Sequence, residues 1–254
     1  METWINETVN FVSNTTSSVL GGLKIIYDIQ YFTCGMLLKE IEDFDSHELK
    51  QSVEIYKSSF PTNETRPADK VVEMLENDRN YHLFISLSNN SVIGISLMYI
   101  FTFLGIGFLD YMAVIPNYQR KGIGNELFNF TLERFSSNIS NNGIGLLMEI
   151  QRENVPDLRE SITRKNRIEF YLRVGAKILD GVDYLLPPLQ HGFEAEEMYL
   201  MIRPLVKIPY LTKESVVQYV NALYSTIYQY ENDDMLEKIS QKLPSRIMLR
   251  DALM

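Results

Sequence analysis

The sequence predicts an α/β domain followed by a helical C-terminal extension, and three observations support this fold class. Strand-like and helix-like runs alternate over residues 34–205. Within this part, residues 106–135 have the pattern of a strand, a glycine-containing loop and a helix. Beyond Pro209, apolar residues recur at helical spacing: Val216, Val220, Leu223 and Ile227. We therefore expect three regions, an N-terminal arm (1–33), the α/β domain (34–205) and the extension (206–254).

The first half of the α/β domain is predicted to contain a strand, two helices and a β-hairpin. Residues 35–41 are rich in strand formers, and Asp45 with Glu48 matches the capping box of a helix start. That helix ends at Pro61, and a second short helix begins near Pro67. Two β-rich runs then flank Ser-Asn-Asn-Ser, a sequence typical of a hairpin turn: residues 81–87 and 92–101.

The second half of the domain continues with a central strand at 106–114, the glycine-containing loop and its helix. A strand at 143–150 and a helix at about 159–174 follow, and Gly175 lies where glycine commonly ends a helix. Two final strands are expected: 177–185 and 197–205. A second helix around 235–243 completes the extension, which would cap the domain or form a face between two copies of the chain.

The composition limits the classes of function. A net charge of −9 argues against broad attraction to nucleic acid or an anionic membrane and favours a cationic, amine-bearing partner. Cys34 is the single cysteine, so no disulfide forms within the chain, and the three histidines lack metal-ligand spacing. No apolar run reaches the roughly 18 residues of a membrane span, and Met1-Glu2 opens without a basic signal segment. We expect a cytoplasmic protein without a metal.

The loop after the central strand has the features of an anion site. Its sequence is Gln119-Arg120-Lys121-Gly122-Ile123-Gly124. A loop that leads into a helix points backbone N–H groups outward, and these donors and the helix dipole favour an anion. Gly122 and Gly124 let the backbone approach a ligand closely, and Arg120 and Lys121 add positive charge. The sequence therefore predicts a phosphate or pyrophosphate site.

The known phosphate-binding motifs narrow the kind of ligand. A P-loop requires Lys-Ser/Thr after the second glycine, and a dinucleotide fingerprint requires a third glycine where this chain has Leu127. The order Val-x-Pro-x-x-Gln-Arg-x-Gly-x-Gly, which begins at Val114, resembles the acetyl-CoA-binding segment of the GNAT superfamily of N-acetyltransferases. The element order over residues 34–205 is also similar to that of this family. The resemblance implies a mixed, largely antiparallel central sheet flanked by helices.

The resemblance also implies an activity, the transfer of an acetyl group from acetyl-CoA to an amine. No Cys or Ser lies in a nucleophile motif, which agrees with direct attack in a ternary complex. The acceptor is a small-molecule amine or an amine of a peptide or protein. The residues expected to bind the coenzyme are Met112, Val114, Gln119, Arg120, Lys121, Gly122, Ile123, Gly124, Asn125 and Arg164.

Three residues are candidates for moving protons during acetyl transfer. By strand alternation, Asp110 shares a face with apolar neighbours, a setting that raises a carboxyl pKa. It also matches the acidic position four residues before the strand-ending valine of many GNAT enzymes. Tyr171 matches the tyrosine of the family's Phe/Leu-Tyr-x-x-x-Gly segment, often proposed as the acid that protonates the coenzyme sulfur. Glu149, on the next strand, is a second candidate base.

One position departs from the family pattern. Many members carry an asparagine seven residues before the tyrosine, where it holds the pantetheine arm, and this chain has Arg164. Arg164 or Arg167 would then bind a coenzyme phosphate. This departure favours an alternative function, a coenzyme A-binding regulatory or assembly module without catalysis, whereas Asp110 with Tyr171 favours the enzyme.

Overall fold

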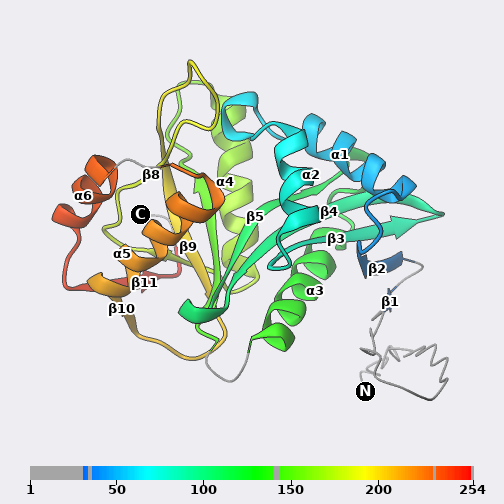
Figure 1. Ribbon diagram of the computed structural model, residues 1–254. Coiled ribbons are helices and arrows are strands. Elements are labelled where there is room, and N and C mark those ends of the chain that lie inside the picture. The colour runs from blue at the N-terminus through cyan, green and yellow to red at the C-terminus, as the bar shows by residue number, and fades with distance from the viewer. Residues whose placement is uncertain (1–30, 34–35, 140–142, 231–232, 253–254) are drawn as a thin grey trace, which may run out of the picture.

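The structure is a computed structural model that describes residues 31–33, 36–139, 143–230 and 233–252 (Figure 1). Most of the predicted N-terminal arm, residues 1–30, lies outside the described residues. The strands are β1 (Tyr31–Thr33), β2 (Met36–Glu40), β3 (Tyr81–Ser88), β4 (Ser91–Phe101), β5 (Ile106–Val114), β6 (Gly145–Gln151), β7 (Lys177–Leu179), β8 (Tyr184–Leu186), β9 (Glu196–Pro204), β10 (Tyr210–Thr212) and β11 (Arg246–Arg250). The α-helices are α1 (His47–Ser59), α2 (Ala68–Asn77), α3 (Ile123–Asn138), α4 (Leu158–Arg173), α5 (Lys213–Ala222) and α6 (Asp233–Lys242).

The described strands form one mixed sheet. Their order is β1-β2-β3-β4-β5-β6-β9-β7-β11-β10, and β8 pairs with β9 beside β7. Among the described strand pairs, only β5 and β6 run parallel, and every other pair is antiparallel. The predicted fold class, a largely antiparallel sheet flanked by helices, is confirmed.

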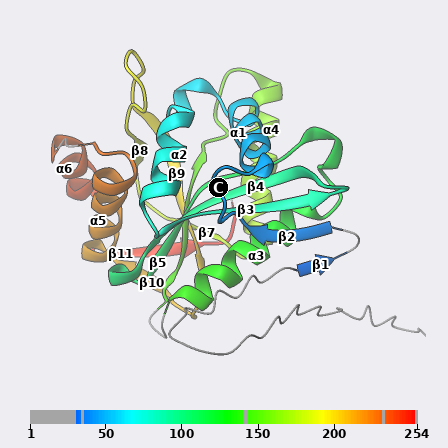
Figure 2. The same ribbon diagram turned by 45° about the vertical axis from the view of Figure 1, so that its right-hand side comes forward.

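Helices cover both faces of the sheet. Figures 1 and 2 show α1 and α2 on one side of β3 and β4, and α3 on the other. The buried side chains form two clusters accordingly. The first cluster includes Ile55 of α1, Leu75 of α2 and Val220 of α5, whereas the second includes Phe128 of α3 and Ile168 of α4. We call these sides the α1 face and the α3 face.

Local sequence explains most element boundaries, with two corrections. The hairpin between β3 and β4 turns at Asn89 and Asn90, which both have positive φ (49° and 62°), as a two-residue turn requires. The predicted cap at Asp45 is wrong by one residue, because Ser46 is the N-cap and accepts from the Leu49 N–H at 3.2 Å. The predicted strand 177–185 is two short strands, β7 and β8, since Gly181 turns the chain at φ +72°.

A β-bulge on β5 changes which side chains face each side of the sheet. Leu97 of β4 pairs with Tyr111, and the next residue, Met98, pairs with Leu109, so Asp110 is the extra residue. Strict alternation predicts one shared face for Ile106, Phe108, Asp110, Met112 and Val114, and this prediction is wrong beyond Asp110, whose carboxyl meets Tyr81 of the α1 face. Ile106, Phe108 and Tyr111 pack on the α1 face, whereas Leu109, Met112 and Val114 pack on the α3 face.

The two parallel strands diverge at the same level. β5 pairs with β6 only from Ile106 to Leu109, opposite Gly145 to Met148, although β5 continues to Val114 and β6 to Gln151. A bulge bends its strand and increases the local twist. The bulge at Asp110 therefore accounts for the opening between β5 and β6.

The C-terminal extension is helical, as predicted, but it also adds to the sheet. β11 pairs antiparallel with β7 and with β10, which places two further strands at this end of the sheet. α5 and α6 pack on the α1 face (Figure 1). After α5, one π-helical turn, Leu223–Ile227, leads to Tyr228. The extension is thus joined to the core through both strands and helices.

Candidate active site

A cavity of about 1100 Å³ lies where β5 and β6 diverge. Ten of the thirteen residues predicted for the site line it: Asp110, Met112, Val114, Gln119, Arg120, Gly122, Gly124, Asn125, Glu149 and Tyr171. Three do not. Ile123 packs into the core on the α3 face, Lys121 places its Nζ 5.0 Å from the centroid of the Tyr118 ring, and Arg164 lies elsewhere.

The glycine-containing loop ends at the first turn of α3, at one end of the cavity. Gly122 is the N-cap of α3 at φ +83°, in the left-handed region that favours glycine, and a Cβ there would meet nothing within 4 Å. The Gln119 side-chain amide donates to the Val114 carbonyl at 2.8 Å and so ties the loop to the end of β5. The first N–H groups of a helix have no partner within the helix. This end of the cavity fits an anionic ligand.

Helix α4 supplies a second wall with positive charge and one tyrosine. Arg167 and Arg173 line the cavity, as does Tyr171. The Tyr171 ring lies edge-on to Phe128 and to Phe170, with centroids 5.9 and 5.1 Å apart. Burial raises the pKa of Tyr171 to about 12, so its hydroxyl keeps its proton at neutral pH.

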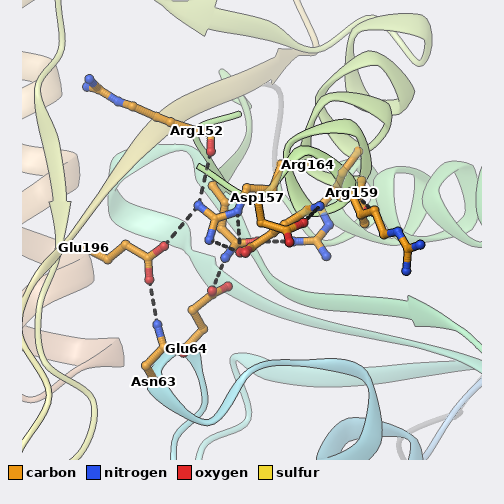
Figure 3. Close-up of polar contacts among 11 residues, drawn as sticks. Asn63, Glu64, Arg152, Asp157, Arg159, Arg164 and Glu196 are labelled. Carbon is orange, nitrogen blue, oxygen red and sulfur yellow. Dashed lines mark hydrogen bonds and ion pairs between the residues drawn. The ribbon is translucent and has the colours of Figure 1, made fainter. Parts of the chain in front are cut away.

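The predicted coenzyme ligand Arg164 is committed to other groups. Its guanidinium pairs with Glu160 at 2.6 Å and with Glu196 at 3.5 Å, and it donates to the Arg152 carbonyl at 3.2 Å (Figure 3). Asn63 donates to the second oxygen of Glu196 at 2.8 Å. Arg164 therefore joins α4 to the strand β9 and to the segment before α2.

Glu149 is a buried carboxyl between two tyrosine hydroxyls. Tyr184 donates to its Oε1 and Tyr228, from the C-terminal extension, donates to its Oε2. Burial raises the pKa of Glu149 to about 7, although both hydrogen bonds act in the opposite direction. Which of Glu149 and Met148 faces inward could not be decided from the sequence. The structure buries Met148 on the α3 face, whereas Glu149 is half-buried beside tyrosines of the α1 face.

Asp110 also lines the cavity, but it is paired. Its Oδ2 accepts from the guanidinium of Arg66 and from the Tyr81 hydroxyl. Burial raises the pKa of the Asp110 carboxyl, while Arg66 and Tyr81 oppose that shift. Arg66 also donates to the Ile227 carbonyl at 2.7 Å. One buried ion pair therefore connects the bulge of β5 to the π-helical turn of the extension.

Several residues of this site could not be found from the sequence. Glu64 and Tyr228 line the cavity, and Arg66 pairs with the carboxylate of Asp110. Glu64 and Arg66 stand in the polar segment before Pro67, which marks only a helix start. Tyr228 lies beside the apolar helical stripe of the extension, a position that indicates packing and not a role in the site.

The described residues contain neither a metal-ligand cluster nor a membrane-spanning helix. No group of three or more His, Cys, Asp and Glu residues among them could hold a metal ion. None of the helices in this part of the chain is long and apolar enough to span a bilayer.

The fold is that of known acetyltransferase structures. A protein from Bacteroides thetaiotaomicron, described as an acetyltransferase of the GNAT family, superposes with a TM-score of 0.61 at 22% identity over 76% of this chain and 99% of its own. An aminoglycoside 6′-N-acetyltransferase solved with coenzyme A has a TM-score of 0.51 at 16% identity over 68% and 98%. No curated protein matches the sequence significantly.

A family model assigns the same class by sequence. Residues 49–159 match the acetyltransferase (GNAT) family, and this range contains the glycine loop and both candidate bases. Residues 49–159 therefore match a GNAT acetyltransferase domain, as the resemblance of the loop implied.

Proposed function

We propose that this protein is an N-acyltransferase that moves an acetyl group from acetyl-CoA to an amine by direct attack in a ternary complex. One observation carries the proposal. A single cavity contains the N-terminus of α3 and, on the same opening between β5 and β6, a carboxyl whose pKa lies at about 7. A base with a pKa near the working pH is best suited to accept a proton during attack.

The α3 face of the opening fits the coenzyme. The loop at Gly122 and the first N–H groups of α3 would bind its pyrophosphate, with Arg120 and the α4 arginines nearby. The part of β5 at Met112 and Val114, which pairs with β4 but not with β6, would align the thioester arm. An open backbone at Gly122 and a cavity of this volume agree with a ligand of that size.

The chain then supplies two proton-handling groups. As the amine nitrogen bonds to the acyl carbon, Glu149 accepts the amine proton and the carbon–sulfur bond breaks. Tyr171, which is protonated at neutral pH, donates a proton to the leaving sulfur. Holding the two reactants side by side supplies much of the acceleration. The sequence predicts Asp110 as the first candidate base, and nothing yet tests that prediction. We propose a positioning role for it instead, because Arg66 already pairs with its carboxylate.

Replacing Asp110 by Asn separates these two roles. The change leaves Arg66 buried without its counter-ion, which costs about 3–5 kcal/mol in similar buried pairs. We therefore expect a large loss of stability in urea or thermal unfolding. If Asp110→Asn is as stable as the wild type but loses activity and the acidic limb of its pH profile, Asp110 is the base instead.

Replacing Tyr228 by Phe tests the contact of the extension with Glu149. The hydrogen bond from Tyr228 lowers the pKa of Glu149, so its removal raises that pKa. Because kcat/KM rises as Glu149 loses its proton, the acidic limb should move to higher pH. Tyr224→Phe is the matched control, since Tyr224 donates to the Leu185 carbonyl instead. An equal shift in both variants would contradict a direct effect on Glu149.

The experiment that tests the proposal follows free thiol in the presence of acetyl-CoA and a panel of amines. We expect amine-dependent release of coenzyme A and an acetylated product by mass spectrometry. Tight binding of acetyl-CoA by calorimetry, without thiol release for any amine, would favour the non-catalytic coenzyme A-binding module.

A further inference from the structure

A third carboxyl that lines the cavity, Glu64, has no part in the proposed proton transfers. It ends the short 3₁₀ helix Thr62–Glu64 before α2, lines the cavity and is 9% exposed. Its Oε1 accepts from the Gln151 side-chain amide. Its Oε2 accepts no hydrogen bond from the described part of the chain. The cavity therefore contains a carboxylate oxygen that accepts no hydrogen bond from the described residues.

The neighbouring cations are already committed to other groups. Arg164 pairs with Glu160 and Glu196, and Arg167 donates to the Gln151 side-chain oxygen at 2.8 Å (Figure 3). Neither arginine donates a hydrogen bond to Glu64. Burial, followed by the negative charge of Glu196, raises the pKa of Glu64 to about 7. The positive charges of Arg167 and Arg164 act in the opposite direction on this pKa, but neither is hydrogen-bonded to Glu64, so a cation from a ligand could bind its carboxylate directly.

The segment that carries Glu64 is held rigidly. The Gln190 side chain donates to the carbonyls of Thr62 and Thr65, at 3.0 and 2.8 Å. The Tyr111 hydroxyl donates to the Glu64 carbonyl at 3.0 Å. Fixed groups bind a ligand at a lower cost in conformational entropy. The backbone that carries the Glu64 carboxyl is thus fixed by hydrogen bonds from Gln190 and Tyr111.

Glu64 and Glu149 lie along one side of β6. Gln151, whose side-chain amide donates to Glu64, follows Glu149 by two residues. The side chains of Glu149 and Gln151 therefore leave β6 on the same side, about 6.6 Å apart along the strand. The cavity wall on this side is mainly apolar: Phe60, Leu186, Leu189 and Met198. Two carboxyls separated by an apolar wall match a ligand with two polar ends and an apolar middle.

We infer that the acceptor is a short linear diamine, in which one nitrogen is acetylated beside Glu149 while the other remains an ammonium ion bound to Glu64. This inference rests on the proposed acetyl transfer to an amine. The spacing of Glu149 and Gln151 along β6 is comparable to the span of a four-carbon spacer, so 1,4-diaminobutane is the first diamine to test.

The test compares three amines with the same four-carbon chain: 1,4-diaminobutane, 4-aminobutan-1-ol and butylamine. In the wild type, kcat/KM for the diamine should exceed that for butylamine at least about tenfold, with the amino alcohol between them, as expected for one charge-assisted hydrogen bond. Glu64→Gln, which keeps the size and removes the charge, should bring the ratio near one, mainly through KM. A preference for butylamine, or an unchanged ratio in Glu64→Gln, would overturn the inference.

Glu196→Gln is the matched control. It changes the same polar network but lies outside the cavity lining, and loss of its charge favours the carboxylate form of Glu64, so the preference for the diamine should remain or increase. Calorimetry of the same three amines, with coenzyme A present, gives an independent readout. If no amine is acetylated but the diamine still binds through Glu64, the proposed function fails and the cation site stands. Equal binding of diamine and butylamine by the wild type overturns the site itself.

Discussion

Replacing Glu149 by Gln is expected to lower turnover at least about a hundredfold while leaving acetyl-CoA affinity nearly unchanged. The variant keeps the size of the side chain and an oxygen that can accept from Tyr184 or Tyr228, but it cannot take a proton from the amine. General-base catalysis is typically worth about 10²–10⁴ in rate. This is the largest effect on catalysis that we expect from a single substitution.

The pH profile distinguishes loss of the base from loss of structure. In the wild type, kcat/KM should rise with pH through about 7, the pKa of Glu149, because the deprotonated carboxylate is the active form. In Glu149→Gln this acidic limb should flatten. Tyr171→Phe should retain the limb, since it removes a proton donor and not the base. An unchanged acidic limb in Glu149→Gln would place the base elsewhere, with Asp110 the next candidate.

Gly122→Glu is expected to weaken acetyl-CoA binding by at least about 2 kcal/mol, or roughly 30-fold in Kd. The substitution places a negative charge at the N-terminus of α3, where the helix favours an anion. It also forces a non-glycine residue to adopt φ +83°. Binding measured by calorimetry should therefore fall more than stability does.

A glycine of the same conformation serves as the control for that result. Gly192 has φ +92°, and a Cβ there would also meet nothing within 4 Å, but it lies outside the cavity lining. Gly192→Glu should carry a similar backbone strain and leave acetyl-CoA affinity unchanged. If both variants bind acetyl-CoA within threefold of the wild type, the loop is not the pyrophosphate site.

The parts of the site that were predictable are those with a local signal. The strand, loop and helix around Gly122 lie within one continuous segment, and each has its own pattern of apolar residues, glycines and charges. Tyr171 was found in the same way, from a short motif at the end of α4. Such patterns depend only on neighbours in the sequence, so they can be recognised without knowledge of the tertiary structure.

The parts that were missed depend on contacts between distant segments. Tyr228 reaches Glu149 across 79 residues, and Arg66 reaches Asp110 across 44. The bulge at Asp110 breaks strand alternation from Tyr111 onward, and nothing in the sequence of β5 marks it. β11 was missed because five residues after a helix gave no strand pattern strong enough to identify.

The central claim, direct transfer between two ligands bound together in the opening between β5 and β6, is tested most directly by initial rates with both substrates varied. Direct attack in a ternary complex predicts intersecting lines in double-reciprocal plots, and a protein mass that acetyl-CoA alone leaves unchanged. Parallel lines, together with a protein that gains one acetyl group in the absence of amine, would contradict the account and require an acyl-enzyme.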